Sequence, residues 1–310
     1  MRKIFTITGN LLAQTTCVFD MPKPGGTARA KLPPKFDVGG KGVNVARTLA
    51  ALGADCAAAV FPAGFSGKRC AGALAGENFE TIAVEISGET RCGLVCADSR
   101  TGAHTTFLGA DIPVPPGAFE KCLEKIKEKI GEGDVVAICG SFPGWGEAHA
   151  EMLSRLVAEK KAILCADTYG APLASLAREK CAAIKINKAE LFSFLKDAGE
   201  PAPESFYGAF LSAQKKYFLN TQIFAATDGA GEFFFRENEK IFSLTPPKIE
   251  REIYPTGCGD AMFAVLLSEI FLKKSGAETA FRRAAKYASM CAETESVGVL
   301  PPEKARQALE

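Results

Sequence analysis

Histidine is scarce in this sequence, which has only His104 and His149 among its 310 residues. Neither lies near another plausible metal ligand in the chain, so a zinc centre or a Ser-His-Asp relay is disfavoured. We expect both histidines to be surface or packing residues. The sequence also lacks a Gly-x-x-x-x-Gly-Lys-Ser/Thr loop and a Gly-x-Gly-x-x-Gly fingerprint, which excludes the common nucleotide-binding motifs.

Cysteine is present eleven times but never as a Cys-x-x-Cys pair, and the two closest, Cys92 and Cys96, are four residues apart. The number is odd, and the chain does not open with the apolar segment of a secretion signal. This usage predicts reduced thiols in the cytoplasm.

Charge of either sign is nearly balanced, because 37 Lys and Arg residues face 36 Asp and Glu residues and leave a net charge of +1. No basic block stands out, so nucleic acids and anionic membranes are poor partners. No apolar stretch is long enough to cross a bilayer. Small molecules are the better partner class.

Short apolar runs alternate with segments of helix length, a pattern that predicts a parallel sheet with helices on both faces. The runs read CAAAVF, DVVAIC, AILCAD, AIKI and QIFAAT. Looser alternating segments in residues 12–36 and 88–110 predict a small β-sheet lid. Helices are expected near residues 260–274, 277–292 and 302–308. We therefore expect one α/β domain over residues 1–310.

The segment YPTGCGDAMFAVLL, Tyr254 to Leu267, places Asp260 between a glycine loop and an apolar helix. Such a loop presents unpaired backbone N–H groups at the positive end of the helix dipole, which suits an anion. Asp260 can act there as a proton acceptor or can simply cap the helix. The same Gly-x-Gly-Asp pattern at residues 131–134 precedes a short β-branched run, where a plain turn explains it.

A second glycine-rich helix start, DVGGKGVNVARTLAALG, carries Lys41 and Asn44. A cation and an amide beside backbone N–H groups suit a phosphate or a sugar hydroxyl, and a tight turn with a surface lysine is the less favoured alternative, given the density of glycines.

Two polar sites follow apolar strands. In KINKAEL, Asn187 and Glu190 are three residues apart and suit magnesium held through its waters, or else form a capping box. In ATDGAGEF, Thr227 and Gly229 suit a phosphate, or else form a hairpin turn.

In this order on an alternating α/β chain, these segments resemble the PfkB (ribokinase-like) family of carbohydrate kinases. The resemblance covers nearly the whole chain. Its most specific parts are GGKGVNVARTLAALG and PTGCGDAMFA, which are similar to the two signatures of the family's sugar-phosphate branch.

The resemblance implies a three-layer α/β/α domain with a β lid, ATP as phosphoryl donor and Mg²⁺ as cofactor. By motif position Asp260 would be the catalytic base. The anion hole would be formed by Gly257, Cys258 and Gly259. The nucleotide side would be formed by Lys185, Asn187, Glu190, Thr227 and Gly229, with Asn187 and Glu190 holding the metal through water. Adenine would lie between the loop after Thr245 and the helix near residues 284–292.

For the acceptor, GETRCGL resembles the 1-phosphofructokinase and tagatose-6-phosphate kinase branch, in which an arginine binds the phosphate already on the sugar. The resemblance implies an acceptor site made of Gln14, Gly39, Gly40, Lys41, Asn44, Arg91 and Ser141. Three features depart from that branch: Gln14 replaces an aspartate, TTFLGADIP lacks the Asn-Glu-Pro-Gly run, and Tyr254 replaces an Asp or Asn.

The leading hypothesis is therefore an ATP-dependent kinase of fructose 1-phosphate, fructose 6-phosphate or tagatose 6-phosphate type. A kinase of an unphosphorylated sugar, sugar acid or nucleoside is the alternative, and a non-catalytic sugar or nucleotide sensor is a third. Members of the family often pair through their lids, so we expect a homodimer of this kind.

Overall fold

A central β-sheet organises the computed structural model, which describes residues 2–20, 25–294 and 297–310. Within those residues it has nine strands. Seven neighbouring strands pair parallel, and the strand next to them at one edge, β12, pairs antiparallel with both of its neighbours, β11 and β13. In sheet order the strands are β13 (Lys240–Leu244), β12 (Phe233–Glu237), β11 (Ile223–Thr227), β10 (Ala183–Asn187), β9 (Ile163–Thr168), β8 (Val135–Gly140), β1 (Ile4–Thr8), β4 (Cys56–Val60) and β5 (Glu80–Ala83).

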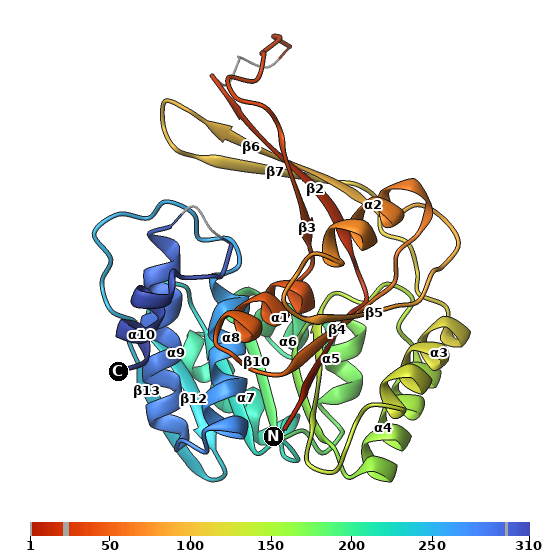
Figure 1. The fold of residues 1–310 in the computed structure, drawn as a ribbon. Helices are drawn as coiled ribbons and strands as arrows, with labels where there is room; N and C mark the ends of the chain where they lie inside the picture. The colour runs from red at the N-terminus through yellow and green to blue at the C-terminus, as the bar shows by residue number, and fades with distance from the viewer. Residues whose placement is uncertain (1, 21–24, 295–296) are drawn as a thin grey trace.

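Helices cover both faces of this sheet (Figure 1). One face carries α3 (Pro116–Lys127), α4 (Glu147–Lys160), α5 (Ala171–Leu176), α6 (Lys188–Asp197) and α7 (Phe206–Lys216). The other carries α1 (Lys41–Ala51), α8 (Cys258–Leu267), α9 (Ala277–Ala292) and α10 (Pro302–Leu309). Strand β1 shows why its run is apolar throughout: Phe5 and Ile7 enter one core and Ile4 the other. The predicted three-layer domain is confirmed.

The helix expected over residues 260–274 is shorter and less regular than predicted. After Leu267 the chain forms a π-helical turn, Ser268–Leu272, and Lys274 then has a φ of 59°, which ends the helix. The buried carboxylate of Glu269 in that turn accepts bonds from Lys273 and Arg283. Apolar periodicity did not reveal the change because Phe271 still packs into the core.

A second sheet of four strands projects from the body as the predicted lid (Figure 1). Its order is β3 (Lys35–Gly39), β2 (Leu12–Phe19), β6 (Cys92–Asp98) and β7 (His104–Leu108). Helix α2 (Gly64–Leu74) packs at its base against β2 and β3. The ring of His104 meets the ring of Tyr254 on the body, with centroids 4.7 Å apart.

The two histidines have structural surroundings, as expected. His149 is buried, stacks on Trp145, and contacts the carbonyl of Val114 through Nε2 at 3.0 Å. His104 is an exposed lid residue. Across the described residues, no helix combines the length and hydrophobicity needed to cross a membrane.

Candidate active site

A cleft of about 890 Å³ lies where the lid faces the carboxyl ends of the parallel strands, and its volume is typical of a small-molecule site. It brings together most of the residues predicted from the sequence. The predicted residues that line it are Gln14, Gly39, Gly40, Lys41, Asn44, Arg91, Lys185, Asn187, Thr227, Gly229, Gly257, Cys258, Gly259 and Asp260.

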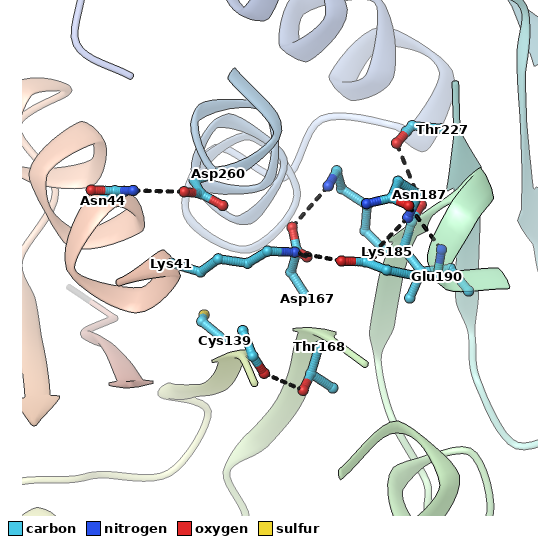
Figure 2. A network of polar contacts seen from close by, with 12 residues as sticks. Lys41, Asn44, Cys139, Asp167, Thr168, Lys185, Asn187, Glu190, Thr227 and Asp260 are labelled. Carbon is cyan, nitrogen blue, oxygen red and sulfur yellow. Dashed lines mark hydrogen bonds and ion pairs between the residues drawn. The ribbon is translucent and has the colours of Figure 1, made fainter. Parts of the chain in front are cut away.

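Asp260 lies in the first turn of α8 and is 7% exposed. Its Oδ2 accepts a hydrogen bond of 2.7 Å from Nδ2 of Asn44 on α1 (Figure 2). The helix begins at Gly257 without a side-chain cap, so the alternative that Asp260 caps the helix does not describe the structure. Burial raises the pKa of this carboxyl to about 6, with the charge of Lys41 opposing the shift. A buried acid with a raised pKa is suited to accept a proton near neutral pH.

The glycine loop before Asp260 depends on its lack of side chains. Gly257 has a φ of 84°, which other residues rarely adopt, and a Cβ there would lie 2.6 Å from Cγ1 of Val297. A Cβ on Gly259 would lie 3.6 Å from Nζ of Lys185, so that ammonium approaches the loop. Backbone N–H groups at a helix start beside a cation form the geometry of an anion site.

A chain of charges crosses the floor of the site (Figure 2). Asp167, at the carboxyl end of β9, accepts from Lys185 at 2.8 Å and from Lys41 at 2.9 Å, and Lys41 also donates to Glu190 at 2.9 Å. Burial alone would raise the pKa of Asp167, but the two ammonium groups hold it below its usual value. Burial likewise favours a lower pKa for Lys41, and the carboxylates of Asp167 and Glu190 raise it well above the usual value. Asp167 and Lys41 therefore both stay ionised at neutral pH.

Asp167 was missed in the sequence. The signal was present, because an acid ends the apolar run AILCAD at the sheet edge that carries the site. No glycine loop or paired amide drew attention to it.

Asn187 and Glu190 form the capping box of α6. The Asn187 Oδ1 accepts from the Glu190 N–H at 2.9 Å, and the Asn187 N–H donates to Glu190 Oε2 at 2.8 Å. Each oxygen retains acceptor capacity, so the pair fits magnesium held through its water shell rather than by direct bonds. The described residues contain no group of three or more His, Cys, Asp or Glu side chains arranged to hold a metal directly.

Part of the cleft is lined by the segments that were expected to hold the nucleoside. The hydroxyl of Thr227 reaches the carbonyl of Ile186 at 3.4 Å, and Gly229 has a φ of 55°. The same cleft is lined by Thr245, Pro246, Pro247, Ala285, Ala288, Ser289 and Ala292. These residues come from the two segments between which adenine was expected.

Two residues that the sequence did not single out, Asn10 and Asp111, contact Arg91 without lining the cleft themselves. Asn10, after β1, donates to Ser141 at 2.8 Å and to Asp111 at 2.9 Å. Arg91 donates to the same oxygen of Asp111 at 2.9 Å. Two predicted site residues, Ser141 and Glu190, are not among the described residues that line the cleft. Ser141 accepts a hydrogen bond from Asn10, which does not line the cleft either. The two cations expected to share one phosphate, Lys41 and Arg91, have separate carboxylate partners.

The sequence profile of the pfkB family of carbohydrate kinases matches residues 19–304. The chain belongs to this family. It is 28% identical over 297 residues to 1-phosphofructokinase of Bacillus subtilis, covering 95% of this chain and 94% of that protein. It is 32% identical over 277 residues to ATP-dependent 6-phosphofructokinase isozyme 2 of Escherichia coli, covering 86% of this chain and 85% of that protein.

Solved structures agree on the fold. The crystal structure of phosphofructokinase-2 from Escherichia coli in complex with substrates and products superposes with a TM-score of 0.86 at 20% identity, covering 100% of this chain and 98% of that one. The pfkB membership makes the protein a carbohydrate kinase with a ribokinase-like fold.

Proposed function

We propose that this pfkB kinase transfers the γ-phosphoryl group of ATP to a hydroxyl of a phosphorylated hexose. The observation that carries the proposal is Asp260, a buried carboxylate with a raised pKa that adjoins a glycine anion loop inside a cleft. Asp260 would take the proton of the acceptor hydroxyl as its oxygen bonds to the γ-phosphorus. The bond between that phosphorus and the β-phosphate oxygen would break and release ADP.

The nucleotide end would be served by Lys185, Thr227 and the loop at Gly257. The backbone N–H groups of the Gly257 loop would stabilise the charge that develops on the transferred phosphoryl group. Asn187 and Glu190 would hold Mg²⁺ through water, and the metal would neutralise phosphate charge when bound.

The acceptor class rests on the relatives and on Arg91. The names of the two curated relatives describe kinases of phosphorylated fructose, and Arg91 is a cation that lines the cleft. Fructose 1-phosphate, fructose 6-phosphate and tagatose 6-phosphate are therefore the acceptors we propose.

One observation favours a second candidate. Because Arg91 and Lys41 are both paired with carboxylates, an unphosphorylated sugar, sugar acid or nucleoside would meet a nearly neutral acceptor end. ATP turnover with the three sugar phosphates, fructose, gluconate and adenosine distinguishes the candidates. Preference for any sugar phosphate supports the proposal, preference for an unphosphorylated compound replaces it, and no turnover at all would favour a sensor.

We further propose a homodimer formed through the lid, in the cytoplasm. Leu94 and Phe107 pair across β6 and β7 and are 37% and 57% exposed, which gives the lid an apolar face that a second copy would cover. The eleven cysteines are all free thiols, as a reducing compartment favours. One of the solved relatives is described as a tetrameric inhibited form, so self-association has a precedent in the fold.

A further inference from the structure

The arginine at the acceptor end is already engaged by an acid of its own chain. Nη1 of Arg91 donates to Oδ1 of Asp111 at 2.9 Å, and Asn10 holds the same oxygen at 2.9 Å. Asp111 lies in the segment TTFLGADIP, which departs from the sugar-phosphate branch of the family. The pair joins the residue that precedes β6 to the segment that follows β7.

The binding capacity of Arg91 is only partly used. Its Nε is buried and has no hydrogen-bond partner among the described residues, and its Nη2 reaches the carbonyl of Asn10 only at 3.5 Å. A buried N–H without a partner is costly, so this guanidinium favours an additional acceptor. Only 14% of the Arg91 side chain is exposed, whereas 48% of Asp111 is. The arginine is therefore fixed, and the carboxylate is free to move into solvent.

We propose that Asp111 competes with the acceptor's phosphate for Arg91 and is displaced from it when that phosphate binds. The inference rests on the proposed function, because it assumes an acceptor that carries an anionic group. A phosphate offers more acceptor oxygens and more charge than a carboxylate, so it can use the Nε that Asp111 leaves unpaired.

The exchange would lower the preference of the site for phosphorylated sugars. An unphosphorylated sugar offers no charge to replace Asp111, so the ion pair between Asp111 and Arg91 stays intact when that sugar binds. A phosphorylated sugar opens the pair at the cost of separating Asp111 from Arg91, and this cost weakens its binding. Asp111 therefore makes the site less tight for sugar phosphates and leaves its affinity for neutral sugars unchanged.

The test replaces the acid without changing its shape. In Asp111→Asn we expect KM for the sugar phosphate that the parent uses to fall by about 2- to 5-fold, the scale measured for one partly exposed ion pair. Inorganic phosphate should inhibit more tightly by a similar factor. KM for ATP and for fructose should not change. The gain should shrink at high ionic strength, because salt screens the competing charge.

Two controls complete the experiment. Glu278→Gln removes a carboxylate from an exposed Glu–Arg pair on α9, so it matches the change in net charge and should alter no KM. In an Arg91→Gln background, Asp111→Asn should have no further effect, because the competition requires the arginine. Thermal melting and the second variant Asp111→Ser separate a change of binding from a loss of folding.

Four results would overturn the inference. An increase of KM for the sugar phosphate in Asp111→Asn, as in Arg91→Gln, would make Asp111 a positioning residue for Arg91. An increase of KM for fructose would make it a ligand of sugar hydroxyls. An unchanged KM in an enzyme that does use sugar phosphates would end the inference alone, whereas a parent enzyme that uses only unphosphorylated sugars would end the proposed function as well.

Discussion

At the scale of single residues, two copies of one pattern have different fates. Asp134, in Gly-Glu-Gly-Asp, accepts from the N–H groups of Lys3 and Gly131 and leads into β8, so the predicted plain turn is confirmed. Asp260, in Gly-Cys-Gly-Asp, accepts a hydrogen bond from the Asn44 side chain on α1, a helix far away in the sequence, and lines the cleft. The surroundings of each carboxylate, rather than the pattern, distinguish them.

Replacing Asp260 by Asn should lower kcat by about 10²- to 10⁴-fold, the usual scale for a lost general base. Nucleotide affinity should change little, because the carboxylate is not needed to bind ATP. Steady-state kinetics and a nucleotide-binding titration would measure both effects. A variant with a nearly normal rate would remove Asp260 from catalysis.

The raised pKa of Asp260 predicts two opposite pH effects. Activity requires the ionised carboxylate, so kcat/KM should fall about tenfold per pH unit below about pH 6 and level off above it.

The raised pKa of Asp260 also predicts that its contribution to folding stability decreases as pH rises. The folded pKa of about 6 exceeds the usual 3.8, so the folded protein binds the proton more tightly and loses stability as pH rises through this window. Asp260→Asn should therefore melt at or above the parent temperature at pH 8 and lose that advantage near pH 4. A lower melting temperature for the variant at pH 8 would show that burying the ionised carboxylate does not destabilise the folded protein.

At the scale of elements, the start of α6 combines a cap with a charge network. Glu190 caps through Oε2 and pairs with Lys41 through Oε1. Because Gln preserves a capping box, Glu190→Gln should change the free energy of unfolding by less than about 1 kcal/mol. The same variant should raise the Mg²⁺ concentration that gives the half-maximal rate. Ser205→Ala is the matched control, since Ser205 caps α7 by accepting from Gly208 at 3.0 Å and does not line the cleft. It should cost about 1 kcal/mol and leave the Mg²⁺ dependence unchanged. If Glu190→Gln leaves the Mg²⁺ dependence unchanged as well, Glu190 is only a cap.

The start of α8 depends on a glycine that no other residue can replace without strain. Gly257→Val should reduce both nucleotide affinity and kcat, because its positive φ and the 2.6 Å approach to Val297 force the loop to move. Gly276→Val, at the start of α9, is the comparison: its φ is −63° and nothing lies within 4 Å of the added Cβ. That variant should bind nucleotide and turn over as the parent does. Full activity in Gly257→Val would place the anion site elsewhere.

At the scale of the whole molecule, the lid exposes three large hydrophobic side chains on its strands β6 and β7, namely Leu94, Phe107 and Leu108. We expect Leu94→Ser combined with Phe107→Ser to shift sedimentation from dimer towards monomer without lowering the melting temperature of the body. Phe65→Ser, on α2 and 80% exposed, removes a similar surface ring outside the lid sheet and should not alter association. A parent protein that sediments as a monomer at all concentrations would contradict the lid dimer.

The sequence alone determined the layers, the lid and many of the residues that line the cleft, because these depend on local periodicity and on glycine loops that open helices. It did not determine how the charges pair. Lys41 was expected to bind the acceptor's phosphate, yet its ammonium lies against Asp167 and Glu190, which are 126 and 149 residues away in the chain. Asp111 and Asn10 are 101 residues apart and meet at Arg91. The contacts of Lys41 form because the parallel strands β9 and β10 bring their carboxyl ends to one edge of the sheet, and the contact of Arg91 with Asp111 forms because β6 and β7 pair antiparallel. The tertiary structure therefore decided which cations already have a partner.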